Sequence, residues 1–152
     1  MKQKYIKIIL LVLLLVVFDQ IVKFLVVTKI GNSSIVIIRN FLEFSYIKNT
    51  GAAFGFLSGR TILLVIITLI FMCYIIKELK KNINDKLLIL SFILIISGSL
   101  GNLIDRIRVG YVIDFISFIL FGIGMPIFNV ADIFITFGIL IYIYKLVKEE
   151  IK

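Results

Sequence analysis

The chain has 152 residues, the length of a single domain, and 61% of them are apolar, with a mean hydropathy of +1.16. Only 17% are charged, against about a quarter in a soluble domain, so the composition excludes an ordinary soluble protein and a disordered one. The 17 lysine and arginine residues exceed the 9 aspartate and glutamate residues. We therefore expect one integral membrane domain over residues 1–152, in which the basic excess reports on topology.

The first apolar stretch runs from about residue 6 to residue 27 and is interrupted by Asp19, Gln20 and Lys23. Three lysines precede it, as they would in a cleaved signal peptide, but no small-residue cleavage site follows. Because about 20 apolar residues cross the hydrocarbon core, this stretch is predicted to be a retained transmembrane helix.

An outward segment follows over residues 31–60. Within it, residues 42–46 alternate apolar and polar side chains, as a strand on a surface does, and residues 35–38 are its expected partner. The sequence Asn49-Thr50-Gly51 predicts a turn, after which the apolar residues 52–57 would return toward lipid.

Three further spans are expected over residues 61–76, 87–104 and 130–147. A second outward segment, over residues 108–129, joins the last two and contains the one proline, Pro126. The predicted fold class is therefore an all-α membrane protein. It has four transmembrane helices and a small extracytoplasmic β-sheet, or cradle, between the first two.

The basic residues indicate the direction of these spans. Ten lysines lie on one side, and they are Lys2, Lys4, Lys7, Lys77, Lys80, Lys81, Lys86, Lys145, Lys148 and Lys152. Six basic residues lie on the other side. Because the base-rich side of a membrane protein is cytoplasmic, both termini are predicted to be cytoplasmic, and we expect no nucleic-acid partner.

Two scarce residue types limit the chemistry. The sequence has no histidine, which excludes Ser–His and Cys–His nucleophile pairs and most zinc sites. Its one cysteine, Cys73, cannot form a disulfide within the chain or hold an iron–sulfur cluster. Acid–base chemistry must therefore use carboxylates, lysine or tyrosine, and we expect no metal or other cofactor.

The nine carboxylates divide by location. Four lie among lysines on the cytoplasmic side, where a solvated charged surface explains them. Ionisable groups at membrane depth are costly and call for a partner or a function. The remaining five must meet this requirement, and they are Asp19, Glu43, Asp105, Asp114 and Asp132.

Asp19 and Lys23 are four residues apart on one helix, in the order that favours an ion pair. The simplest interpretation is a structural pair that holds this helix against its neighbours. In an alternative, Lys23 is the base of a Ser–Lys protease with Ser97 or Ser99 as nucleophile. That alternative is weaker, because Lys23 already has a partner on its own helix.

Polar side chains also gather at the end of the third span. Close helix packing explains the small residues there, but it does not explain Asn102, Asp105 and Arg106. Asn102 and Arg106 are four residues apart and share a helix face. An amide and a fixed cation on one face could hold a peptide carbonyl or orient a carboxylate.

Asp114 and Asp132 are the sharpest functional signal. Both have apolar neighbours, and both fall near the outer interface once the helices pack antiparallel. Each by itself could be an interfacial carboxylate or a charge at a helix N-terminus. Two adjacent buried carboxylates would share one proton, so one could activate water while the other protonates a carbonyl, as in aspartic proteases.

Five short blocks contain these polar residues. They are FDQIVK (18–23), NTGAAF (49–54), GSLGNLIDR (98–106), VIDF (112–115) and FNVAD (128–132). In this order and on four spans, the blocks together resemble those of the lipoprotein signal peptidase, or signal peptidase II, family. Each block alone is weak, whereas the set covers most of the chain and is highly specific.

The resemblance implies a monomeric aspartic endopeptidase of the bacterial inner or cytoplasmic membrane, with its active site at the outer face. Its partners would be membrane lipid and prolipoproteins whose +1 cysteine carries a diacylglyceryl group. The implied catalytic pair is Asp114 and Asp132, and the implied structural pair is Asp19 and Lys23. The implied substrate-binding residues are Asn49, Asn102, Arg106 and Asn129, with Asp105 at the edge of the site.

Two other functions stay open on the residues alone. A small ion or proton carrier would use intramembrane Asp and Lys side chains. However, the carboxylates collect at one face, and only Asp19 and Lys23 lie deeper. A noncatalytic membrane scaffold would use the polar residues only to join helices, so Asp→Asn changes would damage its assembly as well as its activity.

Overall fold

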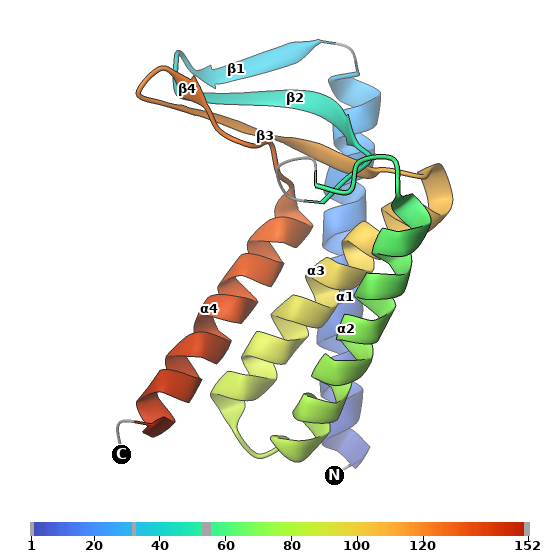
Figure 1. Cartoon of the computed structure of the whole chain (residues 1–152), viewed down its shortest axis with the longest axis vertical. Coiled ribbons are helices and arrows are strands. Elements are labelled where there is room, and N and C mark those ends of the chain that lie inside the picture. Colours follow the sequence, from blue (N-terminus) through green and yellow to red (C-terminus); the bar gives the residue numbers. More distant parts are fainter. Residues whose placement is uncertain (1, 32, 53–55, 151–152) are drawn as a thin grey trace.

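The computed structural model describes residues 2–31, 33–52 and 56–150. Within these ranges, four long helices form a bundle and a sheet lies across one end of it (Figure 1). The helices are α1 (Lys2–Lys29), α2 (Thr61–Lys81), α3 (Lys86–Val109) and α4 (Val130–Glu150). All four are long and apolar enough to cross a membrane, which confirms the four predicted spans.

The helices extend beyond the predicted apolar limits, because their charged ends continue the same backbone hydrogen bonding. Both ends of α3 are capped. The side chain of Asp85 accepts from the backbone N–H groups of Leu87 and Leu88 and so caps the start of α3. Gly110, with a φ of 84°, ends the helix in the left-handed conformation that glycine adopts without strain.

α3 is the central helix of the bundle. Its apolar span is 67% buried, against 11% to 28% for the other three helices. Glycines allow this close packing, since a Cβ on Gly98 would overlap the backbone carbonyl of Ala131 in α4. One on Gly138 would lie 2.8 Å from the Ser91 carbonyl in α3. α3 therefore supports the elements that carry the site described below.

The sheet has four antiparallel strands in chain order, namely β1 (Ser34–Ile38), β2 (Leu42–Asn49), β3 (Val112–Leu120) and β4 (Ile123–Gly124). β1 and β2 confirm the predicted hairpin, and Asn40 has a φ of 59° in the turn between them. The predicted return of residues 52–57 toward lipid includes 53–55, which lie outside the described residues. That part remains a prediction.

β3 and β4 come from the segment between α3 and α4, so the sheet is larger than the sequence predicted. The run of residues 112–120 is almost uninterruptedly apolar and lacks the alternation expected of a surface strand. Its first four residues are buried, which explains this pattern. Pairing of β2 with β3 places Asn49 opposite Val112 and Ile47 opposite Asp114, and thus joins the two outward segments.

Candidate active site

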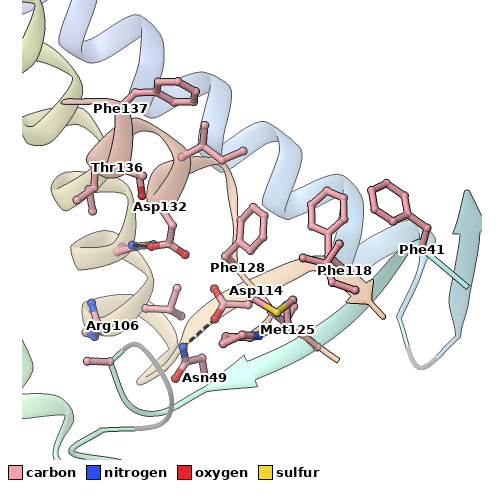
Figure 2. Close-up of a pocket in the computed structure, with 18 residues that line it drawn as sticks. Phe41, Asn49, Arg106, Asp114, Phe118, Met125, Phe128, Asp132, Thr136 and Phe137 are labelled. Carbon is pink, nitrogen blue, oxygen red and sulfur yellow. Dashed lines mark hydrogen bonds between the residues drawn. The ribbon is translucent and has the colours of Figure 1, made fainter. Parts of the chain in front are cut away.

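A cavity of about 1020 Å³ lies where the sheet meets α3 and α4 (Figure 2). Its wall is polar at one end and apolar elsewhere. The polar side chains on it are Asn49, Asn102, Arg106, Asp114, Asp132 and Thr136. The apolar side chains include Phe41, Phe118, Met125, Phe128, Ile133 and Phe137. Such a cavity can receive a chain that has both a polar part and an apolar part.

Asp114 lies on β3 and is 2% exposed. Its Oδ2 accepts a hydrogen bond of 2.7 Å from the side-chain amide of Asn49, and its Oδ1 accepts one of 2.6 Å from that of Asn129. Burial, reinforced by the charge of Asp132, raises the pKa of Asp114 from 3.8 to about 6, against the lowering effect of the two amides. A carboxyl with this pKa can hold a proton close to neutral pH and can pass it on.

Asp132 lies in the first turn of α4, where the helix dipole favours a negative charge. It forms a reciprocal capping pair with Asn129. The Asp132 N–H donates to Asn129 Oδ1 at 3.0 Å, and the Asn129 N–H donates to Asp132 Oδ2 at 3.1 Å. The other carboxylate oxygen, Oδ1, accepts from Asn102 Nδ2 at 2.7 Å. The start of α4 therefore holds this carboxylate in one orientation.

Two asparagines connect the carboxylates. Asn129 is fully buried, and its Nδ2 donates both to Asp114 at 2.6 Å and to the Oδ1 of Asn102 at 3.1 Å. Asn102 in turn donates to Asp132. Figure 2 shows the carboxyl groups of Asp114 and Asp132 directed into the same cavity. The tertiary structure thus brings together two acidic groups that are 18 positions apart in the sequence.

Arg106 and Asn49 organise the chain that leaves β2. The Nη2 of Arg106 donates to the Gly51 carbonyl at 3.0 Å, and the Gly51 N–H donates to Asn49 Oδ1 at 2.9 Å. The predicted turn at residues 49–51 is therefore held against α3. Both side chains also line the cavity, so they can meet a bound chain.

The pair Asp19 and Lys23 is present, with 3.0 Å between Nζ and Oδ2, but it belongs to a larger cluster. Asp105 lies 2.8 Å from the same Nζ and is fully buried. Its Oδ2 also accepts the Ile113 N–H, so its carboxylate lies in the Lys23 cluster and does not line the cavity. The edge position implied for Asp105 remains a prediction, and in the structure Asp105 turns toward α1 while Asn102 and Arg106 reach the cavity.

The Ser–Lys alternative does not fit the structure. The hydroxyl of Ser97 donates to the Ile93 carbonyl at 2.7 Å within its own helix. The ammonium of Lys23 is directed at two carboxylates and at Asn102. Among residues 2–31, 33–52 and 56–150, no three His, Cys, Asp or Glu side chains are placed to hold a metal ion.

Sequence reasoning missed the role of Gln20 and the apolar wall. The side-chain amide of Gln20 donates to Asp105 at 3.0 Å and to the Gly101 carbonyl at 3.2 Å, which completes the buried cluster. A polar residue beside Asp19 in an apolar span was an available signal for this role. The apolar wall had no such signal, because its side chains come from both sheet and helix and are alike only in hydrophobicity.

Similarity to known proteins covers most of the chain. The family model described as signal peptidase (SPase) II matches residues 11–148. The lipoprotein signal peptidase of Halothermothrix orenii is 41% identical over 140 residues, which are 91% of this chain and 94% of the relative. That of Clostridium tetani is 37% identical over 145 residues, or 93% of each chain. A solved bacterial membrane enzyme superimposes with a TM-score of 0.86 at 36% identity, covering 95% of this chain and 89% of the other.

Proposed function

The chain belongs to the signal peptidase II family of aspartic peptidases, and from this premise we propose that Asp114 and Asp132 are its catalytic pair. Membership makes it a multi-pass bacterial membrane protease that processes lipoprotein signal peptides. We propose further that it cleaves diacylglyceryl-modified prolipoproteins directly before the lipidated cysteine. The observation that carries the proposal is a pair of carboxylates that face one cavity and are joined through Asn102 and Asn129.

In the proposed mechanism, the two carboxyl groups share one proton and one water molecule. The ionised carboxylate takes a proton from the water, whose oxygen attacks the carbonyl carbon before the cysteine. The protonated carboxyl donates to the carbonyl oxygen, which gives a neutral tetrahedral gem-diol. The carboxyl that took the proton from water then donates it to the cysteine nitrogen as the C–N bond breaks. The other carboxylate takes a proton from a gem-diol hydroxyl, which restores the starting protonation of the pair.

The raised pKa of Asp114 supports a proton shared by the pair in the free enzyme. The macroscopic titration nevertheless belongs to the coupled pair. Asn102 and Asn129 hold the carboxylates in place, so little reorganisation is needed during reaction. Arg106 and Asn49 are positioned on the cavity wall to hold the substrate backbone, which would lower the entropic part of the barrier.

The arrangement of the helices supports the proposed topology. α1 begins and α4 ends at the end of the bundle opposite the sheet (Figure 1). Lysines gather at that end, which favours cytoplasmic termini and an active site at the outer face. An apolar signal helix and two acyl chains could then stay in lipid while the scissile bond meets the polar end of the cavity.

The decisive experiment compares a diacylglyceryl-modified precursor with its unmodified twin. We expect the wild-type protein to cleave only the modified precursor, and Asp114→Asn and Asp132→Asn to remain folded with almost no cleavage. The matched control is Glu43→Gln, which neutralises a carboxylate of β2 that does not line the cavity. Cleavage of both precursors would refute the substrate class. Processing near the wild-type rate by either Asp variant would refute that residue's role.

A further inference from the structure

The buried ammonium of Lys23 makes one contact that charge balance does not require. Its Nζ lies 3.0 Å from Asp19 Oδ2 and 2.8 Å from Asp105 Oδ2, and these two carboxylates supply all the negative charge that it needs. Its third hydrogen bond, of 3.0 Å, goes to the neutral Oδ1 of Asn102. Asn102 is a cavity residue that donates to Asp132, so this bond links the buried cluster directly to the site.

The orientation of the Asn102 amide matters because its two ends differ chemically. Its Oδ1 accepts from both Lys23 and Asn129, and its Nδ2 donates to Asp132. If the amide rotated by half a turn, its NH₂ group would face the ammonium and its oxygen would face a carboxylate. A buried cation opposes this rotation more strongly than a neutral donor would.

The same orientation extends to the second carboxylate. With the oxygen of Asn102 facing Asn129, one hydrogen of the Asn129 amide is directed at Asn102 and the other at Asp114. The oxygen of Asn129 is meanwhile occupied by the Asp132 N–H. The side-chain amides of Asn102 and Asn129 therefore each have a single orientation in which all their hydrogen-bond partners are satisfied. In that orientation both carboxylates of the proposed catalytic pair receive an N–H donor.

We propose that Lys23 is a positioning residue of the active site. It fixes the amide of Asn102, and through it that of Asn129, so that Asp114 and Asp132 are both held by N–H donors. The inference rests on the proposed function of these two carboxylates. This positioning role of Lys23 is additional to its structural pairing with Asp19, since a purely structural ion pair would need no contact with Asn102.

A direct deletion would not separate the two roles, because removing Lys23 alone leaves two buried carboxylates without a counter-charge. The test therefore compares two variants in which positions 19, 23 and 105 together carry no net charge, while the half-exposed Arg108, 4.0 Å from Asp105 in the wild type, is the same in both. The first is Asp105→Asn, which keeps Lys23 paired with Asp19. The second is Asp19→Asn/Lys23→Met/Asp105→Asn, in which none of these three positions is ionised and Asn102 keeps the donor from Asn129 but loses the one from position 23.

Both variants are assayed with the diacylglyceryl-modified precursor and by thermal unfolding in the same detergent. We expect the triple variant to unfold at about the same temperature as Asp105→Asn and to keep its KM, while its kcat is lower by about 10- to 100-fold, as for loss of a group that orients an active-site residue without touching the substrate. A purely structural role for Lys23 predicts equal kcat values for the two variants.

Equal kcat values, a change in KM alone, or a triple variant that fails to fold beside a folded Asp105→Asn would each overturn the proposal. The last result would show that Lys23 serves the fold itself. These outcomes are distinct from failure of the proposed function, in which the wild-type protein does not cleave the modified precursor.

Discussion

Replacing Asp114 with asparagine separates the cost of burying this carboxyl from its use in the reaction. Burial raises its pKa from 3.8 to about 6, so the folded protein binds this proton more tightly than the unfolded chain does. The stabilisation due to the protonated group is therefore complete below pH 3.8 and is lost as the pH rises through about 6. The amide introduced by Asp114→Asn cannot titrate, so the variant should lack this component of the pH dependence.

The size of the effect follows from the two pKa values. A difference of about two pKa units, at about 1.4 kcal/mol each, changes the free energy of unfolding by about 3 kcal/mol when the pH goes from below both pKa values to above both. Between pH 7 and pH 5 the same linkage makes the wild-type protein more stable by about 1 kcal/mol. The asparagine also loses one of the two hydrogen bonds from Asn49 and Asn129, at a cost of about 1–3 kcal/mol. At neutral pH, where relief of burial opposes this loss, the two proteins should differ by no more than about 2 kcal/mol.

The assay is thermal unfolding of both proteins at pH 5, 6 and 7 in one detergent, together with precursor cleavage. The wild-type stability should rise toward pH 5 by more than that of Asp114→Asn, and the variant should lose at least about 100-fold in cleavage rate. Because the groups outside the pair are common to both proteins, the difference in slope reports on the coupled pair Asp114 and Asp132, which has one carboxyl fewer in the variant. Parallel pH profiles would refute the reasoning about burial, and retained cleavage would refute the catalytic role.

Three further perturbations test the packing, the cavity wall and a helix cap. Gly98→Ala should lower the unfolding temperature strongly, because the added Cβ would overlap the backbone of α4. Gly124→Ala is the control, since its Cβ would meet open space and the unfolding temperature should change little. Equal shifts in the two variants would contradict this packing. Arg106→Gln should reduce the cleavage rate at least about tenfold more than Arg108→Gln does, since only Arg106 reaches the cavity wall. A comparable loss of cleavage in both variants would indicate a general effect of charge. Asp85→Ala should cost about 1 kcal/mol of stability in thermal unfolding, because it removes the cap of α3 together with the ion pair to Lys145, and it should leave kcat unchanged.

The helical part of the fold was predictable because it depends on local sequence. A bilayer requires a helix of about 20 apolar residues wherever the chain crosses it, so the spans follow from the lengths of the apolar runs. The hairpin of β1 and β2 was predictable for a similar reason, since a short alternating strand pairs with its neighbour in sequence. The strand β3 was not, because a buried apolar run has no alternation to mark it.

The candidate site divides in the same way. The polar residues themselves were identifiable, because each carboxylate at membrane depth is costly and must have a reason to be there. The partners of these polar residues could not be identified from the sequence. Asp105 looked like a neighbour of Arg106 in the site, but helix packing turns it toward Lys23 on α1.

Residue spacing along one helix or strand predicts which side chains share a face, since the backbone period is constant. It carries no information on which faces meet when α1, α3, α4 and the sheet pack together. The bonds from Lys23 to Asn102, from Asn129 to Asp114 and from Asn49 to Asp114 all cross between elements. Only the packed chain brings these groups within hydrogen-bonding distance, because glycines of α3 and α4 allow their backbones to approach and β2 pairs with β3.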